Sequence, residues 1–220
     1  MGSGRISAPV RKAADLDGPG AETDRQVRRP RRGRPRSEDA DRAILSAAAE
    51  VLADRGLAAM SIEEVASRAG VGKATIYRRW SSKGTLALDA FLAQTKQQLP
   101  PPDTGTLRED LQAALQNWVH TVTLTDAGGT VASLVAETQQ DPELAASWRD
   151  RVVVPVRRMY TIVIERAIRR GEIPADTDAD VALDLVFGAA FYRLLNRHRP
   201  LNEQFVRQVA DVVTAGLVAR

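Results

Sequence analysis

The 220-residue sequence contains no cysteine and only two histidines. Without cysteine the chain cannot build a disulfide framework, a thiolate zinc site or a cysteine nucleophile, and two histidines are too few for a histidine-rich metal centre. Aromatic residues make up only 5% of the chain, and alanine, valine and leucine dominate its apolar residues, which favours helices over a sheet sandwich. We therefore expect an all-α protein of about nine helices, with no metal site and no cofactor.

Long hydrophobic runs are also missing. Near the C-terminus the longest apolar run without a charge, residues 185–192, falls far short of the roughly 18 residues that a membrane span needs. The N-terminus has no apolar core of the kind found in signal peptides. Hydrophobic residues still make up 44% of the chain, which is enough to build a core. The sequence therefore predicts a soluble, cytoplasmic protein with no membrane partner.

The net charge of +3 is unevenly distributed along the chain. Residues 1–37 contain ten lysines and arginines against four acidic residues, whereas residues 99–220 contain thirteen against sixteen. A basic tail on a neutral-to-acidic body indicates a polyanionic partner that the tail can reach. The alternative is a solvated tail that only increases solubility.

Composition and periodicity divide the chain into three parts. Residues 1–36 are rich in glycine, proline, serine and arginine and show no helical or strand period, so we expect a disordered basic arm. Apolar residues at helical spacing begin after Ser37. Three consecutive prolines, Pro100–Pro102, then end the first helical region. The predicted domains are therefore residues 37–98 and residues 103–220.

The second domain also shows helical patterns throughout. A capping-box pattern at Thr106 predicts the start of a helix that runs to about Leu124. The pair Gly128-Gly129 is expected to break the helical pattern, so that the next helix begins near Val131. Pro155 is expected to mark a kink or a boundary in a long helix. The ranges predicted for the longer helices near the C-terminus are 152–170, 178–196 and 202–219.

Residues Ile62–Trp80 have the pattern of a helix-turn-helix unit. Ser61 with Glu64 forms a capping box at the start of the first helix, and Gly70 suits the sharp turn because it tolerates positive φ. The second helix would then lie in the DNA major groove. An ordinary helical hairpin in a bundle is the alternative, but it would not expose several cations. The predicted exposed positions of the second helix are Lys73, Thr75, Tyr77, Arg78 and Arg79.

The stretch Ala69–Gly84 resembles the signature of the TetR family of transcriptional regulators, and the resemblance extends over residues 38–98. Trp80 stands where the family usually has phenylalanine, and Gly84 stands where glutamate is common. The second domain diverges strongly from the family. There the resemblance is limited to the number of helices and the apolar last pair.

This resemblance implies roles for particular residues. Tyr77 and Lys83 would bind phosphates, while Lys73 and Thr75 would face the major groove. Ser61 would place the start of its helix against a backbone phosphate, a use of helix N-termini that also follows from the helix dipole. The resemblance further implies a cavity for a small-molecule effector in the second domain.

Arg32, Arg34 and Arg36 lie directly before the first helix in an Arg-Gly-Arg-Pro-Arg context. This sequence resembles the core of the AT-hook, in which glycine and proline keep the chain thin and extended. Guanidinium groups suit the negative potential of a narrow, A·T-rich minor groove. We expect these arginines to enter the minor groove; nonspecific contact with phosphates is the alternative.

Two further sets of residues are candidates in the second domain. Helices that are apolar on two sides must be covered on two sides, so the last two helices are expected to form a homodimer interface. The residues expected to line an effector cavity are Trp118, His120, Trp148, Met159, Tyr160 and Phe187. The residues expected at the dimer interface are Leu185, Gly188, Tyr192, Phe205, Val209 and Val213.

The interpretation that joins these features is a dimeric regulator that binds double-stranded DNA. It would act as a repressor that a small-molecule effector releases from a near-palindromic operator. An architectural DNA-binding protein without an effector is one alternative. An enzyme or carrier built on the C-terminal helices is less favoured, because no nucleophile–base pair and no carboxylates at a defined spacing are present. We therefore expect no catalytic residues.

Overall fold

A computed structural model describes residues 35–95, 100–125 and 127–218 of the chain. Within these ranges the chain is helical and contains no β-strand, which confirms the all-α prediction. The first four helices are α1 (Pro35–Ala59), α2 (Ile62–Ala69), α3 (Lys73–Tyr77) and α4 (Lys83–Gln94). The remaining elements are α5 (Leu107–Thr123), α6 (Ala127–Thr138), α7 (Pro142–Trp148), the π-helical turn η1 (Arg149–Val153), α8 (Val154–Arg169), α9 (Ala179–Asn196) and α10 (Glu203–Val218).

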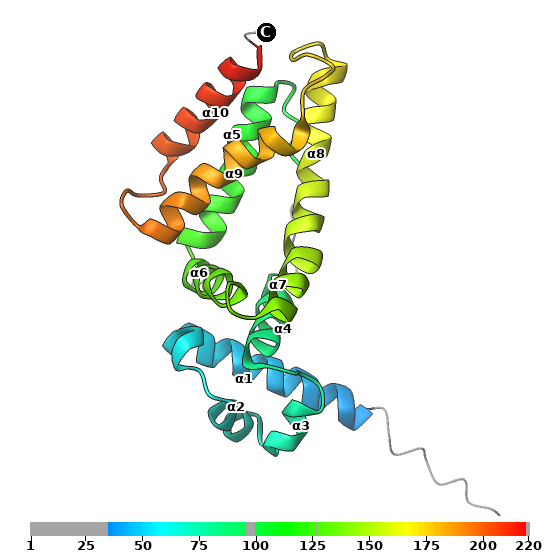
Figure 1. The fold of residues 1–220 in the computed structure, drawn as a ribbon, viewed down its shortest axis with the longest axis vertical. Helices are drawn as coiled ribbons and strands as arrows, with labels where there is room; N and C mark the ends of the chain where they lie inside the picture. The colour runs from blue at the N-terminus through cyan, green and yellow to red at the C-terminus, as the bar shows by residue number, and fades with distance from the viewer. Residues whose placement is uncertain (1–34, 96–99, 126, 219–220) are drawn as a thin grey trace, which may run out of the picture.

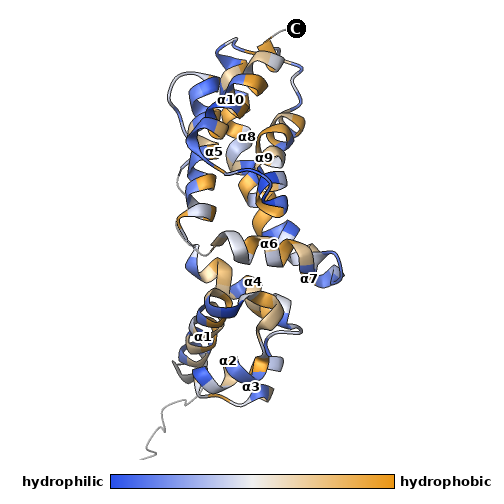
Figure 2. Ribbon diagram, turned by 90° about the vertical axis from the view of Figure 1, so that its left-hand side faces the viewer, coloured by the Kyte–Doolittle hydropathy of each residue, from blue (hydrophilic) through white to orange (hydrophobic). Residues whose placement is uncertain are grey.

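The molecule is elongated, with α1–α3 at one end and α5, α8, α9 and α10 at the other (Figure 1). Helices α4, α6 and α7 lie between the two ends in both views (Figures 1 and 2). None of the helices in the described ranges is long and apolar enough to cross a bilayer.

Two hydrophobic cores hold these elements together. The core at the α1–α4 end also contains Leu134 of α6 and Leu144 and Trp148 of α7. The second core joins α5, α8, α9 and α10. Two helices of the predicted second domain thus pack into the core of the first, and a movement of α6 or α7 would reach the first four helices directly.

Glycine and proline residues mark interruptions and boundaries of the helices. Helix α1 has a non-helical residue at Gly56, with φ 70° and ψ 169°, and glycine tolerates such a positive φ. Pro155 lies in the first turn of α8, immediately after η1, so it marks a boundary. Helix α4 ends at Gln94, and the last residues of the first predicted domain, 96–98, lie outside the described ranges.

The prediction that Gly128-Gly129 breaks the helix is wrong. Both residues lie inside the first turn of α6, which begins at Ala127. A Cβ atom on Gly128 would lie 2.3 Å from the carbonyl oxygen of Val122, whereas nothing would lie within 4 Å of a Cβ on Gly129. Gly128 therefore permits the close approach of α6 to the end of α5 rather than interrupting the chain.

Candidate functional site

The turn between α2 and α3 is built by local sequence signals. The Ser61 side chain accepts a hydrogen bond from the Glu64 amide at 3.2 Å and so caps α2. Gly70 ends α2 in the left-handed region, at φ 65° and ψ 32°, which favours glycine. Val65 and Ile76 are fully buried on either side of this turn. The two helices are therefore held as a unit that presents the opposite side of α3 to solvent.

The outer side of α3 carries three of the residues predicted to bind DNA. Tyr77 is 56% exposed, and Lys73 and Arg78 are exposed as well. The Lys73 ammonium donates a hydrogen bond of 2.7 Å to the carboxylate of Glu63 on α2. This contact raises the pKa of Lys73 and lowers the pKa of Glu63, so both groups are charged at neutral pH. Thr75 is half-buried, in contrast to its predicted exposure.

Arg79 does not lie on this exposed side, which corrects its predicted position. Only 19% of its side chain is exposed, and its guanidinium forms an ion pair with Asp41 of α1. It also donates a hydrogen bond of 3.2 Å to the Thr75 carbonyl. Arg79 thus joins the end of α3 to α1, and its charge is shared with a carboxylate rather than displayed beside Tyr77.

The other predicted DNA contacts lie at helix starts or outside the described residues. Lys83 is the first residue of α4, half-buried, and its ammonium donates to the Ala58 carbonyl at 3.4 Å. Arg32 and Arg34 lie outside the described residues. Arg36 belongs to the first turn of α1, but its side chain lies outside the described part of the structure. The minor-groove arm therefore stays a prediction.

Five of the six residues predicted for an effector cavity do line cavities of the second half. The larger of two adjoining cavities, about 200 Å³ in volume, is lined by Trp118, Trp148, Met159 and Tyr160 among other residues. A smaller one of about 120 Å³ shares three of these residues and adds Phe187. Tyr160 is 7% exposed, and its burial raises the pKa of its hydroxyl. These adjoining spaces form an apolar, aromatic cavity between α4, α5, η1, α8 and α9, which we call the inner cavity.

His120 does not belong to the inner cavity, which corrects the sixth prediction. Its side chain is exposed, and its ring nitrogen Nε2 lies 2.6 Å from the side-chain nitrogen Nε2 of Gln116, one turn earlier on α5. It is adjacent in sequence to Val119, which is buried, so the helical period turns it away from the core.

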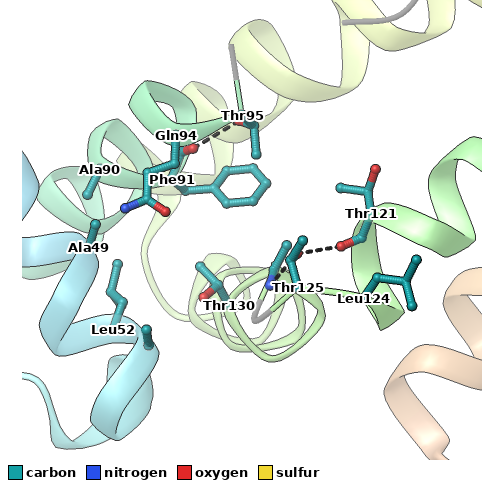
Figure 3. A pocket seen from close by; sticks show the side chains of 12 residues that line it. Ala49, Leu52, Ala90, Phe91, Gln94, Thr95, Thr121, Leu124, Thr125 and Thr130 are labelled. Atoms are coloured by element: carbon teal, nitrogen blue, oxygen red, sulfur yellow. Dashed lines mark hydrogen bonds between the residues drawn. The ribbon is translucent and has the colours of Figure 1, made fainter. Parts of the chain in front are cut away.

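A second, wider pocket of about 640 Å³ lies at the junction of α1, α4, α5 and α6 (Figure 3). Its wall includes Thr95, Thr121, Thr125 and Thr130, and Phe91 points toward it from α4. The Thr125 hydroxyl donates a hydrogen bond of 2.6 Å to the Thr121 carbonyl of α5, so this polar group of the wall already has a partner within the protein. Phe91, Thr95 and Thr121 line the inner cavity too, which places the two spaces side by side.

The last two helices expose an apolar face, and the structure sorts the predicted interface residues into two groups. Leu185 is 54% exposed, Tyr192 is 62% exposed, and Gly188 is exposed between them. Phe205 and Val213 are instead buried in the protomer's own core, so their predicted place at an interface is wrong; Val209 is half-buried. The other large hydrophobic residues of α9 and α10 that are exposed are Val181, Leu195, Val212 and Val218.

Two residues of interest were missed by sequence reasoning. The guanidinium of Arg151 on η1 lies 2.5 Å from a carboxylate oxygen of Asp89 on α4. The other oxygen of Asp89 accepts a hydrogen bond of 2.8 Å from the Trp80 indole. Because these residues are far apart in sequence and each belongs to a common residue type, no local pattern could have indicated the contact.

Comparisons with known proteins agree with the site. The family described as "Bacterial regulatory proteins, tetR family" matches residues 44–90, and "Tetracyclin repressor-like, C-terminal domain" matches residues 101–213. The HTH-type transcriptional regulator YdeS of Bacillus subtilis is 37% identical, over 86% of this chain and 95% of its own length. The DNA-binding transcriptional repressor TetR of Mycobacteroides abscessus is 30% identical, over 83% and 96%.

Solved structures show the same architecture. The TetR family transcription regulator SCO0332 superposes with a TM-score of 0.67 at 33% identity, covering 81% of this chain and 98% of its own. The flavonoid-responsive regulator FrrA superposes with a TM-score of 0.60 at 22% identity, covering 83% and 96%, and supports the fold alone. Taken with the exposed helix α3 and the family matches that together reach from residue 44 to residue 213, these likenesses show that the chain belongs to the TetR family of DNA-binding transcriptional regulators.

Proposed function

We propose that this regulator is a homodimeric repressor that a small-molecule effector releases from a near-palindromic operator. The observation that carries the proposal is the position of α4. Its start follows α3 directly, while Phe91, Leu92 and Thr95 near its end line the inner cavity. One helix therefore belongs both to the DNA-reading unit and to the wall of a ligand-sized space.

The contacts available to DNA are those expected of a helix in the major groove. Lys73, Tyr77 and Arg78 offer cations and a hydroxyl on one side of α3. Lys73 is held by Glu63 in the free protein, so binding DNA would exchange a carboxylate for a phosphate or a base edge. The dipoles of the α2 and α4 N-termini would add phosphate contacts near Ser61 and Lys83.

The apolar face of α9 and α10 supports a dimer. Leu185, Tyr192 and Val212 are each more than half exposed in the single chain, which costs free energy unless another surface covers them. A second copy related by a two-fold axis would pair these helices as a four-helix bundle. Two-fold symmetry would then place two copies of α3 on two half-sites of a near-palindrome.

Release would follow from differential binding. An effector in the inner cavity must favour one position of α4 over another, or it would shift nothing. Because the two α3 helices must fit two half-sites at once, a small change in their separation would prevent simultaneous docking. Helices α6 and α7 share a core with α1–α4, so a shift of either helix would also move the DNA-binding end of the molecule.

Selection of bound sites from random DNA by the full-length protein tests this proposal. We expect a two-fold symmetric motif, followed by loss of binding to it when a cavity ligand from a compound screen is added. A motif without symmetry would contradict the dimeric arrangement. Weak sequence preference dominated by A·T content would favour the alternative, an architectural DNA-binding protein without an effector.

A further inference from the structure

The larger part of the inner cavity, the space of about 200 Å³, has one charged residue in its wall. Of the described residues that line its main part, Arg151 alone carries a charge, and the others are apolar, aromatic or neutral polar. The Arg151 side chain is 48% exposed, whereas Tyr160 and Trp148 of the same wall are buried. A cavity with an apolar interior and a cation in its wall suits a molecule with an apolar body and an anionic end.

Arg151 has donors to spare for such an anion. A guanidinium has five N–H donors, and the recorded partner of Arg151 among the described residues is the carboxylate of Asp89. Arg157 of α8 lines the smaller part of the cavity but is already bound to the carboxylates of Asp180 and Asp184. Arg151 is therefore the better placed of the two cations to accept an incoming anion.

The inner cavity also contains a neutral donor. Tyr160 lines both parts of the cavity and stacks against Phe187 with ring centroids 5.1 Å apart. No hydrogen bond joins its hydroxyl to another residue in the described part of the chain. The hydroxyl can therefore exchange a hydrogen bond with a polar atom of a ligand in the cavity.

Asp89 connects Arg151 to the DNA-reading unit. Its two carboxylate oxygens are divided between the Arg151 guanidinium at 2.5 Å and the Trp80 indole at 2.8 Å. Trp80 is 7% exposed, and its amide donates to the Ile76 carbonyl of α3 at 3.0 Å. The Asp89 carboxylate thus connects Trp80, which lies just after α3, with Arg151 in the wall of the cavity.

Further contacts hold α7 against the start of α4 and the residue Ser81 before it. A Cβ on Gly84 of α4 would lie 2.7 Å from a methyl group of Leu144 on α7, so the helices approach closely there. The Ser81 hydroxyl donates to the Glu143 carboxylate at 2.8 Å. The continuous segment α7–η1 is therefore both a wall of the cavity and a support for the corner between α3 and α4.

We propose that the effector is an amphipathic anion, such as a carboxylate with an apolar body, whose charged end takes Arg151 away from Asp89. This inference rests on the proposed function and names the chemistry of its ligand. Losing its cation leaves the Asp89 carboxylate, whose side chain is 28% exposed, with the Trp80 indole as its one partner among the described residues. Helix α4 then shifts to bring that carboxylate to water, and Trp80 with the end of α3 moves with it.

Binding of matched acids and amides tests the ligand class. Decanoate and phenylbutyrate are compared with their primary amides by calorimetry on the full-length protein. We expect each acid to bind about tenfold more tightly than its amide, as a charge-assisted contact predicts, and Arg151→Gln to abolish the difference. The control Arg149→Gln removes an exposed neighbouring charge and should keep the preference. Equal binding of acid and amide, no binding of either acid, or a preference that survives Arg151→Gln would overturn the inference.

The relay is tested with Asp89→Asn, whose amide oxygen still accepts from the Trp80 indole while the charge on Arg151 loses its partner. We expect operator affinity to fall several-fold and decanoate affinity to rise by a similar factor, while Asp150→Asn changes neither. An Asp89→Asn protein that melts normally and matches the wild type in both affinities would overturn the relay. If an uncharged compound releases the selected operator equally from wild type and Arg151→Gln, the proposed function stands and this inference fails; if no operator is selected, the proposed function itself fails.

Discussion

The two ends of the molecule expose opposite chemistry. The end formed by α1–α3 presents charges and a tyrosine hydroxyl, and Tyr77 is its only large hydrophobic side chain among the exposed described residues. The end formed by α8–α10 exposes Val181, Leu185, Tyr192 and Val212 instead. Cations suit a polyanion and an apolar surface suits a second copy, so the two ends favour different partners.

Ion pairs within the charged end hold several of its cations in place. Lys73 is held by Glu63, Arg79 by Asp41 and Arg68 by Glu64 and Asp54. The exposed pair of Lys73 and Glu63 contributes little to stability, but all of these pairs fix the positions of cations before DNA binds. The apolar end also contains ion pairs, such as that of Arg157 with Asp180 and Asp184, but its exposed hydrophobic side chains are ones that water solvates poorly. Charge at one end is arranged for recognition, and apolar area at the other is available for burial.

The largest expected effect comes from placing a charge on the apolar face. Leu185→Asp should convert the proposed dimer to monomers and weaken operator binding by about a hundredfold, because the gain from joining two half-sites disappears. Sedimentation and a binding titration measure the two effects. Leu124→Asp is the matched control, since Leu124 is 75% exposed but lies at the end of α5. A Leu185→Asp protein that stays dimeric would move the interface elsewhere.

The next largest effect is expected on stability, from an alanine substitution at Gly128 of α6, with the neighbouring Gly129 as the matched control. Gly128→Ala places a methyl group against the Val122 carbonyl and should lower the free energy of unfolding by about 1–3 kcal/mol. Gly129→Ala has open space and should raise it by about 0.5–1 kcal/mol, because alanine restricts the unfolded chain and favours the helix. Urea denaturation of both variants measures the difference. Equal effects of the two substitutions would mean that the close approach of α5 and α6 is not retained in solution.

At the charged end, Tyr77→Phe removes a predicted phosphate contact. It should weaken binding to every DNA sequence about tenfold and leave the selected motif unchanged. Lys83→Ala should act similarly and also reduce the slope of log affinity against log salt by about 0.9. Lys73→Ala should instead change the preferred sequence. A motif that is identical for wild type and Lys73→Ala would assign Lys73 to the phosphates.

The smallest expected effect concerns Glu63. Lys73 lowers the pKa of this carboxylate, so the ion pair is intact at neutral pH and is lost only as the pH falls through the lowered pKa of Glu63. Glu63→Gln removes a negative charge that faces DNA and frees Lys73, and should tighten DNA binding two- to threefold at neutral pH. The gain should shrink in acid, where the wild-type carboxylate is itself protonated. A loss of affinity would show that Glu63 positions Lys73 for binding.

Local signals in the sequence were sufficient for the DNA-reading half and insufficient for the rest. Ser61, Gly70 and the apolar spacing around them act over a few residues, and the structure places them as predicted. Arg79 was misplaced because its partner Asp41 is far away in the chain. Phe205 and Val213 were misplaced for a related reason: an apolar stripe does not say whether its own chain or a second copy covers it. Gly128 was read as a breaker because a close backbone approach leaves no local pattern.

The central claim is that occupancy of the inner cavity and occupancy of DNA are coupled, and linkage gives its most direct test. The affinity of a cavity ligand is measured through the fluorescence of Trp118 and Trp148, with and without saturating operator DNA. Coupling between two sites is reciprocal, so the operator should weaken ligand binding by the same factor by which the ligand weakens operator binding. A ligand affinity that is unchanged by operator DNA would contradict the account.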